Sequence, residues 1–327
     1  MDEIAADVNG ERWDCSILFK IMPFAPLKYL IMGIKTLRKL FKEEPNVVIA
    51  QNPPIFLPLV CWVYSMFSNC MLVVDHHCVW SVKTIRYPVL RDFVAFWERF
   101  VARHAELNIS PHDVWTGMLG GFGDVRTFTV IDYVREVKVK KISRDSICRT
   151  RYLVVYPGGS GGMERPDLAV EAVQGLDDVT LVVTGDKQYL KSLLSFENDR
   201  IVFTGFLPRA DYYGIMEASD FVINLTEEPY TIPHFIYEAI ALGKPVISSP
   251  DEALERTFND YLYILENIDV EDVKMQVRDM LDNLDFWAEK ACLLHEVLRH
   301  KRGAQIEKLK SEIAGRTFVE KRHTHMT

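Results

Sequence analysis

The sequence predicts an α/β protein with two Rossmann-like, doubly wound domains facing a cleft. Short apolar strands alternate with helical patterns along most of the chain, an order typical of parallel sheets covered by helices. The chain has 327 residues, more than one ordinary hydrophobic core accommodates, so we expect two domains. A polar, basic stretch at residues 138–151 separates two series of strands and predicts the boundary between the domains.

The periodicity of apolar residues places the elements of each domain. The first series of strands is expected at residues 15–19, 47–50, 72–74, 107–109 and 127–130. The second series is expected at residues 152–155, 180–184, 201–203, 221–224 and 245–248. Helices are expected at residues 92–104, 167–174 and 235–241, with one long helix at about 284–313. The predicted domains are residues 1–143, joined by a C-terminal helix at about 310–327, and residues 152–309, with a linker at residues 144–151.

Residues 45–74 contain no charged side chain, and this run is longer than the roughly 20 residues needed to span a bilayer. The sequence QNPP at residues 51–54 interrupts the run with a loop that no helix would cross. We therefore predict a strand, a buried helix and a second strand of a parallel sheet here, and no membrane span.

Composition and charge narrow the class of protein. Apolar residues make up 48% and charged residues 26%, which is typical of a globular protein and excludes a disordered or disulfide-dense chain. The net charge of -8 argues against nucleic acid as a partner. The six cysteines show no metal-binding spacing, and residues 1–7 lack the apolar core of a signal peptide. We therefore expect a cytoplasmic protein with no metal site.

A glycine-rich segment lies between the strand at residues 152–155 and the helix at 167–174. Its members are Gly158, Gly159, Ser160, Gly161 and Gly162. Glycines let the backbone approach a ligand closely, and the start of a helix offers unpaired N–H groups to an anion. Arg165, beside this helix start, can clamp a diphosphate with two parallel hydrogen bonds. The segment therefore predicts a phosphate-binding loop.

The same segment also fits the G-x-S-x-G pattern of serine hydrolases, in a strand–turn–helix context. Ser160 would then be the nucleophile, with Asp220 and His234 as the nearest candidate partners. Five small, flexible residues make a poor strained elbow, and no oxyanion motif of the HGGG type occurs. A serine hydrolase remains the alternative prediction for this segment.

A second candidate site follows the strand at residues 221–224. A loop leads into the helix that contains Glu238, and Gly243 ends that helix ahead of the next strand. A carboxylate such as Glu238 can accept hydrogen bonds from two hydroxyls at once, as sugar recognition requires. The pattern fits equally well a glutamate that is exposed to solvent on the helix and has no ligand.

Residues 152 to about 250 resemble the donor-binding domain of GT-B glycosyltransferases of the group-1, or family-four, type. The motifs occur in that family's order: the glycine loop with its basic residue, VVTGD at 182–186, IVFTGF at 201–206, DYY at 211–213, ASD at 218–220, and TIP…YEAIALGKPVI at 231–247. The last block is the most specific. Residues 1–150 resemble the family only in layout.

The resemblance implies a nucleotide-sugar site. Glu238 would hold the ribose, the glycine loop and Arg165 would hold the diphosphate, and the backbone at Gly205 and Leu207 would flank the base. The loop at residues 230–234 would face the sugar. The implied donor-binding residues are Gly158, Gly159, Ser160, Gly161, Gly185, Gly205, Leu207, Tyr230, Thr231, Ile232, Pro233, His234 and Glu238. Arg165 stands where the family usually has lysine, which keeps the charge.

Two strand ends of the first domain carry the candidate acceptor side. Asn52 and Pro53 end one strand, and Asp75 and His77 end the next. The resemblance implies that His77 faces the transferred sugar, although a histidine at a strand end is as often structural. The first strand unit of the family has no counterpart here, so we expect a shortened first domain or a partner that completes it.

Residues 25–42 form a basic amphipathic stretch. The stretch either lies on an anionic membrane surface, where a lipid-linked acceptor would be found, or covers the sheet with a solvated face.

Taken together, these features predict a hexosyltransferase that uses a UDP- or GDP-linked sugar and a glycan or lipid-linked acceptor. Arg165, His77 and Glu238 are the expected catalytic residues. The resemblance implies retention of the anomeric configuration. The absence of an Asp-x-Asp sequence predicts that neither a metal nor another cofactor is needed. Besides the Ser160 hydrolase, a catalytically silent GT-B protein that binds a sugar nucleotide or a partner remains open.

Overall fold

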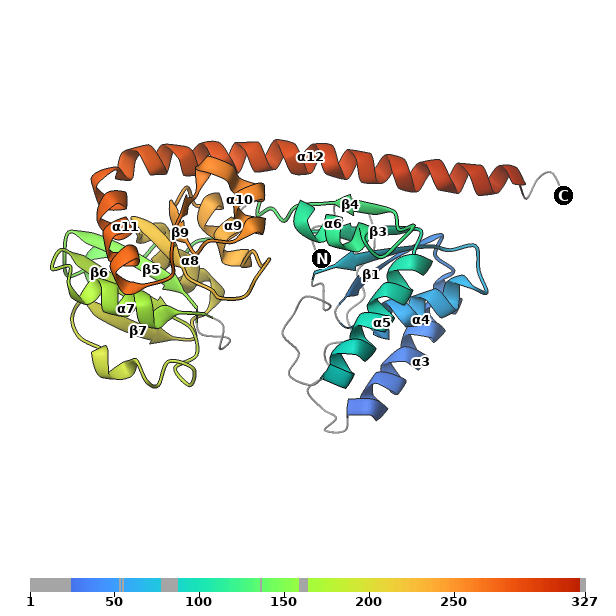
Figure 1. Ribbon diagram of the computed structural model, residues 1–327, viewed down its shortest axis with the longest axis horizontal. Helices are drawn as coiled ribbons and strands as arrows, with labels where there is room; N and C mark the ends of the chain where they lie inside the picture. The colour runs from blue at the N-terminus through green and yellow to red at the C-terminus, as the bar shows by residue number, and fades with distance from the viewer. Residues whose placement is uncertain are drawn as a thin grey trace. The chain divides into compact units, whose positions relative to one another are not determined.

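Figure 1 shows the computed structural model, which describes residues 25–52, 54, 56–77, 88–135, 137–158 and 164–323. The chain divides into two compact units, Met1–Ile131 with Lys301–Thr327, and Asp132–His300. Each unit contains a parallel β-sheet with helices packed on it, which confirms the predicted α/β class. The strand expected at residues 15–19 lies outside the described residues.

The first unit contains a four-stranded parallel sheet of order β1-β2-β3-β4. Its strands are β1 (Val47–Asn52), β2 (Met71–His76), β3 (Leu107–Ser110) and β4 (Thr127–Thr129). Its helices are α3 (Ala25–Glu43), α4 (Phe56–Ser65), α5 (Pro88–His104), α6 (Asp113–Gly120) and the C-terminal part of α12 (Leu284–His323). Side chains of α3, α4 and α5 pack against one face of the sheet, and Ile306 and Leu309 of α12 pack against the other.

The uncharged segment at residues 45–74 forms β1, α4 and β2, as predicted. Successive side chains of a strand point to opposite faces of the sheet. Leu72 and Val74 therefore meet the cluster formed with α4 and α5, whereas Val73 meets α12, and all three are fully buried. Among the described residues, no helix combines the length and the apolar character needed to cross a bilayer.

The second unit contains a six-stranded sheet of order β10-β9-β8-β5-β6-β7, and all neighbouring strands are parallel. Its strands are β5 (Tyr152–Pro157), β6 (Val179–Thr184), β7 (Ile201–Gly205), β8 (Phe221–Asn224), β9 (Val246–Ser248) and β10 (Tyr263–Ile264). Its helices are α7 (Pro166–Gln174), α8 (Arg209–Ala218), α9 (His234–Ala241), α10 (Glu252–Phe258), α11 (Val270–Asp282) and the first part of α12. The two-residue strand β10 was not predicted.

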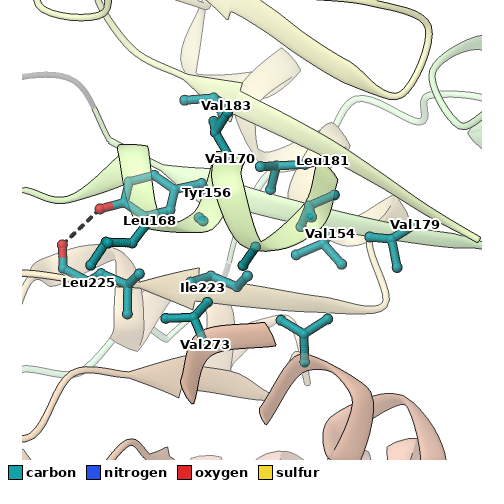
Figure 2. Packing of buried hydrophobic residues seen from close by; sticks show 14 of the residues in the cluster. Val154, Tyr156, Leu168, Val170, Val179, Leu181, Val183, Ile223, Leu225 and Val273 are labelled. Atoms are coloured by element: carbon teal, nitrogen blue, oxygen red, sulfur yellow. Dashed lines mark hydrogen bonds between the residues drawn. The ribbon is translucent and has the colours of Figure 1, made fainter. Parts of the chain in front are cut away.

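Helices α7 and α11 cover one face of this second sheet (Figure 2). Val154 and Ile223 of the strands and Val170 of α7 are fully buried in the same apolar cluster. One polar group lies within this core: the Tyr156 hydroxyl donates a hydrogen bond to the Leu225 carbonyl at 2.8 Å. Because burial disfavours the phenolate, it raises the pKa of Tyr156. The bond joins the carboxyl ends of β5 and β8.

The stretch predicted as a linker, residues 144–151, packs on the second unit instead, and that unit already begins at Asp132. The guanidinium of Arg144 donates to both carboxylate oxygens of Asp220, at 3.0 and 2.5 Å. Ile147 packs against a buried cluster of the second unit. Arg144, one of the basic residues that suggested a linker, therefore belongs to an ion pair within the second unit.

Helix α12 is continuous and is shared by both units. Residues up to His300 belong to the second unit and residues from Lys301 onward to the first, whereas the sequence placed this change at about residue 310. Arg302 is buried, and its Nη1 donates to the carbonyl of Ile131. The side chains of α12 therefore begin to contact residues of the first unit within one turn after His300.

Candidate functional site

The order of strands reverses between β5 and β8 in the second sheet. From β5 the chain passes to β6 and β7 on one side, and β8, β9 and β10 follow on the other. Ligands of doubly wound sheets bind beyond the carboxyl ends of the strands at such a switch point. Here Glu164 forms an antiparallel bridge with Thr226, and the amide of Arg165 donates to the Leu225 carbonyl at 3.0 Å. The segment that enters α7 therefore lies beside the end of β8.

Gly158, the first residue after β5, has no room for a side chain. A Cβ atom there would lie 2.6 Å from Cε1 of Tyr156 and 3.0 Å from a carboxylate oxygen of Glu164. The predicted loop residues Gly159, Ser160 and Gly161 lie outside the described residues.

Arg165 lies at the N-cap of α7, and its guanidinium is held between two carboxylates. Nε and Nη2 donate to Asp167 at 3.0 and 2.7 Å, while Nη1 donates to Glu227 at 2.5 Å. These hydrogen bonds raise the pKa of Arg165. The cation sits where the sequence placed it, but both of its edges are occupied by anions of this chain.

Glu238 lies in α9, and its side chain is only 12% exposed. The hydroxyl of Tyr213 donates to Oε1 at 2.6 Å, and that of Tyr212 donates to Oε2 at 3.2 Å. His234, one turn earlier, approaches Oε1 at 3.5 Å. Burial alone would raise the pKa of Glu238, but the hydrogen bonds from His234, Tyr213 and Tyr212 outweigh it and lower this pKa. The carboxylate is therefore ionised and fixed in direction, unlike a solvated helix glutamate.

The charge of Glu238 in turn affects the pKa values of the two tyrosines. Burial and the nearby Glu238 charge raise the pKa of Tyr212, and the same causes raise the pKa of Tyr213 to about 12. Both phenols are therefore hydrogen-bond donors at neutral pH. Arg209 of α8 completes the cluster, with Nη2 at 3.8 Å from the Glu238 carboxylate.

The loop at residues 226–233 approaches α9 through a strained backbone. Tyr230 has φ = 55°, a left-handed conformation that is costly for a residue with a Cβ. Its amide donates to a carboxylate oxygen of Asp251 at 2.5 Å, and Asp251 also caps α10. Thr231, Ile232 and Pro233 are half-buried.

The other predicted donor-site residues lie along the same edge of the sheet. Gly185 and Gly205 follow β6 and end β7 with φ of 116° and 73°, which glycine adopts without strain. The amide of Gly185 donates to the carbonyl of Gly205 at 3.2 Å. Leu207 packs partly against the cluster beneath α8.

In the first unit, a buried hydrogen-bond chain crosses β1, β2 and β3. The side-chain nitrogen of Asn108 donates to the Ala102 carbonyl at 2.9 Å, so its oxygen faces Nε2 of His76 at 2.9 Å. Nε2 therefore carries the proton, and Nδ1 accepts from the side-chain nitrogen of Asn52 at 3.3 Å. Burial lowers the pKa of His76 to about 4, which keeps the ring neutral. The remaining atom, Asn52 Oδ1, is buried and has no hydrogen-bond donor in the described part of the chain.

The side chains of His77 and Asp75 are hydrogen-bonded to each other beside this chain. Nε2 of His77 lies 2.8 Å from Oδ2 of Asp75, whose side chain is 4% exposed against 24% for His77. The amide of His77 donates to the Asn52 carbonyl at 2.9 Å. The predicted acceptor-side residues Asn52, Asp75 and His77 are therefore neighbours, while Pro53 lies outside the described residues.

The structure does not place Asp220, the predicted acid of the serine hydrolase alternative, at the end of the sheet where the glycine-rich segment begins. Asp220 accepts from the Leu153 amide at 2.7 Å and binds Arg144, so it lies at the amino end of β5. Gly158 follows the carboxyl end of that strand, about 16 Å away at the rise of an extended chain. Asp220 therefore lies at the opposite end of β5 from Gly158, where the glycine-rich segment begins.

Residues 140–290 match the family model described as glycosyl transferases group 1. The matched residues all lie in the second unit, which is therefore similar to the group 1 glycosyltransferases. The predicted family resemblance and the predicted enzyme class, a glycosyltransferase, are thereby confirmed. No curated protein sequence matches the chain significantly.

Solved structures of GT-B glycosyltransferases share the fold. HepE of Anabaena in complex with UDP is 17% identical over 88% of this chain and 82% of that chain, with a TM-score of 0.70. Sucrose-phosphate synthase of Thermosynechococcus elongatus is 14% identical over 91% and 79% of the two chains, also with a TM-score of 0.70. A glycosyltransferase of Rickettsia africae is 14% identical over 93% and 84%, with a TM-score of 0.65. Identities this low establish the fold alone, and the GT-B fold is the one that the sequence predicts.

Sequence reasoning named Arg165 and Glu238 as candidates but did not name the residues that bind their side chains. Asp167 and Glu227 bind Arg165, and Tyr213 and Arg209 surround Glu238. Asp167 lies only two residues from Arg165, so the sequence alone could have predicted their ion pair. Glu227 comes from the loop after β8, and only the neighbouring positions of β5 and β8 in the sheet bring it there.

Proposed function

We propose that this glycosyltransferase moves a hexose from a UDP- or GDP-linked sugar to a glycan or lipid-linked acceptor. The supporting observation is that Arg165 lies at the start of α7, beside the ends of β5 and β8, where the strand order reverses. A helix start and a guanidinium together favour a diphosphate at this place. HepE, which has the same fold, was solved in complexes with UDP and with UDP-glucose, which supports a nucleoside-diphosphate donor.

Arg165 would act on the leaving group. As the glycosidic bond breaks, its electron pair moves to the diphosphate oxygen, and a nearby cation lowers the energy of that developing charge. Glu227 occupies Nη1 of the guanidinium, so a donor phosphate would displace Glu227 and take over that hydrogen bond. Asp167, which accepts hydrogen bonds from both Nε and Nη2 of Arg165, would keep the guanidinium oriented.

Glu238 would bind the ribose hydroxyls. Oε2 accepts only the Tyr212 hydroxyl among the described residues and can accept a ribose hydroxyl as well, whereas at Oε1 a second hydroxyl would compete with His234. The loop at residues 230–234 would face the sugar, and Gly185, Gly205 and Leu207 would line the base and diphosphate.

Asn52, Asp75 and His77 would form the acceptor side, with His77 oriented by Asp75 and hydrogen-bonded to a hydroxyl of the transferred sugar. The absence of an Asp-x-Asp sequence supports a reaction without a metal ion or other cofactor. We further propose retention of the anomeric configuration and a cytoplasmic location.

A thermal-shift screen against UDP, GDP and their sugars tests the donor, because a ligand that binds only the native state raises its unfolding temperature. We expect one nucleotide family to stabilise the protein, and Arg165→Ala to abolish the shift while Arg165→Lys retains part of it. Unchanged donor binding by Arg165→Ala would overturn the proposal. Anomeric configuration and metal dependence follow from NMR of the product and from assays with a chelator.

Turnover separates this proposal from its two alternatives. Ser160→Ala should leave glycosyl transfer largely intact, whereas a serine hydrolase would lose all activity. Donor binding without turnover for any acceptor would favour the catalytically silent protein.

A further inference from the structure

We propose that the outer face of the α3–α4–α5 layer docks on an anionic lipid membrane. This apolar–basic face consists of the exposed side chains of α3, of α5 and of the turn after α4. The three helices lie side by side in Figure 1, and α4 contacts both of its neighbours. The proposal concerns a partner of the protein and is independent of the donor site.

Helix α3 exposes the side chains that an ordinary sheet-covering helix would bury. Leu30 is 60% exposed and Phe41 is 50% exposed, whereas the polar Thr36 is only 5% exposed. Leu27, Leu30, Ile34 and Phe41 recur at helical spacing, so they form one outward stripe. The helix is therefore amphipathic with part of its apolar stripe facing outward.

Helix α5 and the end of α4 extend this surface. Val89, Phe93 and Phe96 recur at helical spacing on the exposed side of α5, and Phe67, just after α4, is 73% exposed. Phe96 and Phe93 also contact the ring of Trp97, which orders an aromatic row along the helix. Monomeric soluble proteins rarely expose contiguous apolar patches of this kind without a binding partner.

The excess of basic side chains on the same helices favours an anionic partner. Exposed basic side chains on α3 and α5 are Lys35, Arg38, Lys42, Arg91, Arg99 and Arg103. The three helices together contain eight Lys and Arg against three Asp and Glu, in a chain whose net charge is -8. Basic residues interleaved with Leu, Ile and Phe on in-plane helices are typical of binding to anionic lipid headgroups.

A second copy of the chain fits this face less well than a lipid surface does. A two-fold interface would bring the basic patches of both copies together, and like charges across an interface cost free energy. Anionic lipids instead supply opposite charge to the basic residues and an acyl boundary to the apolar stripe.

Flotation of the full-length protein with vesicles tests the proposal. We expect binding to phosphatidylcholine vesicles that contain about 30% phosphatidylglycerol, little binding to pure phosphatidylcholine, and weaker binding when salt rises from about 0.05 to 0.5 M. Leu30→Ser with Phe96→Ser should lower partitioning about tenfold, or about 1.4 kcal/mol, because both side chains lose apolar area buried in the lipid. Lys35→Glu with Arg38→Glu should lower it by about the same factor.

Matched controls lie in the second unit. Met275→Ser removes an apolar side chain that is 60% exposed on α11, and Lys191→Glu reverses an exposed charge, so neither should change vesicle binding. Since all these side chains are exposed, the unfolding temperatures should stay within a few degrees of wild type. No binding to anionic vesicles at low salt would overturn the proposal, as would equal losses in the controls. A loss of dimer in light scattering, in step with the loss of the apolar side chains, would assign the face to a second copy instead.

Discussion

Removing the charge of Glu227 should strengthen nucleotide binding. Glu227 holds Nη1 of Arg165 at 2.5 Å and would be displaced by a donor phosphate. Two charges about 6 Å apart repel by roughly 0.7 kcal/mol at the dielectric of water. A diphosphate with about two charges would therefore gain about 1.4 kcal/mol in Glu227→Gln, or about tenfold in affinity at low salt.

The same substitution should barely change stability. The Glu227 side chain is 52% exposed, and exposed ion pairs contribute only about 0.2–1 kcal/mol to the free energy of unfolding. Isothermal titration with UDP and GDP at low and high salt measures the affinity, and urea unfolding measures the stability. Glu171→Gln, which removes an exposed carboxylate farther along α7, is the control and should bind as wild type does. Weaker nucleotide binding by Glu227→Gln would refute the reasoning, because it would make Glu227 a ligand contact.

Three further substitutions have defined outcomes. His76 has a folded pKa of about 4 against 6.5 for the ordinary ring, so the unfolded state binds more protons between these values and stability falls as the pH drops. Urea unfolding should give about 2 kcal/mol less stability at pH 5 than at pH 7, and His76→Gln should remove this slope. The pKa of Glu238 is lower in the folded state than its ordinary value of 4.5, so its ionised form stabilises the fold at pH values above 4.5. This stabilisation is lost as the pH falls below 4.5 and through the folded pKa. The stability difference between wild type and Glu238→Gln, about 1–2 kcal/mol at pH 7, should therefore shrink in acid. Gly158→Ala should cost about 1–3 kcal/mol in the same assay, because its Cβ would meet the buried Tyr156 ring at 2.6 Å.

Most elements of the fold were predictable because apolar periodicity and glycine punctuation are local signals. The strands around residues 47, 72, 152 and 180 begin within about one residue of their predicted starts. The unit boundary was not predictable in the same way. Arg144 reads as a solvated linker residue until Asp220, far along the chain, is placed beside it.

The site was only partly predictable for a related reason. Arg165 and Glu238 stand in motifs, whereas Glu227 meets Arg165 only because β5 and β8 are neighbours in the sheet. Tyr213 was visible as part of a motif, but its hydrogen bond to Glu238 depends on how α8 packs beside α9. Local motifs therefore predicted the charged candidates Arg165 and Glu238, but not the residues whose hydrogen bonds orient them and shift their pKa values.

Asn52 shows how hydrogen-bond direction carries information that the sequence lacks. The Ala102 carbonyl can only accept, which fixes in turn the orientation of Asn108, the tautomer of His76 and the amide of Asn52. Oδ1 of Asn52 is left as a buried acceptor, and an unmet buried acceptor costs about 1–3 kcal/mol. A hydroxyl or N–H of a ligand that reached Oδ1 would recover that free energy, whereas a ligand group that can only accept would not. Because Oδ1 is buried, a ligand would reach it only after Asn52 or a neighbouring group moved, and the ligand would then need a hydrogen-bond donor.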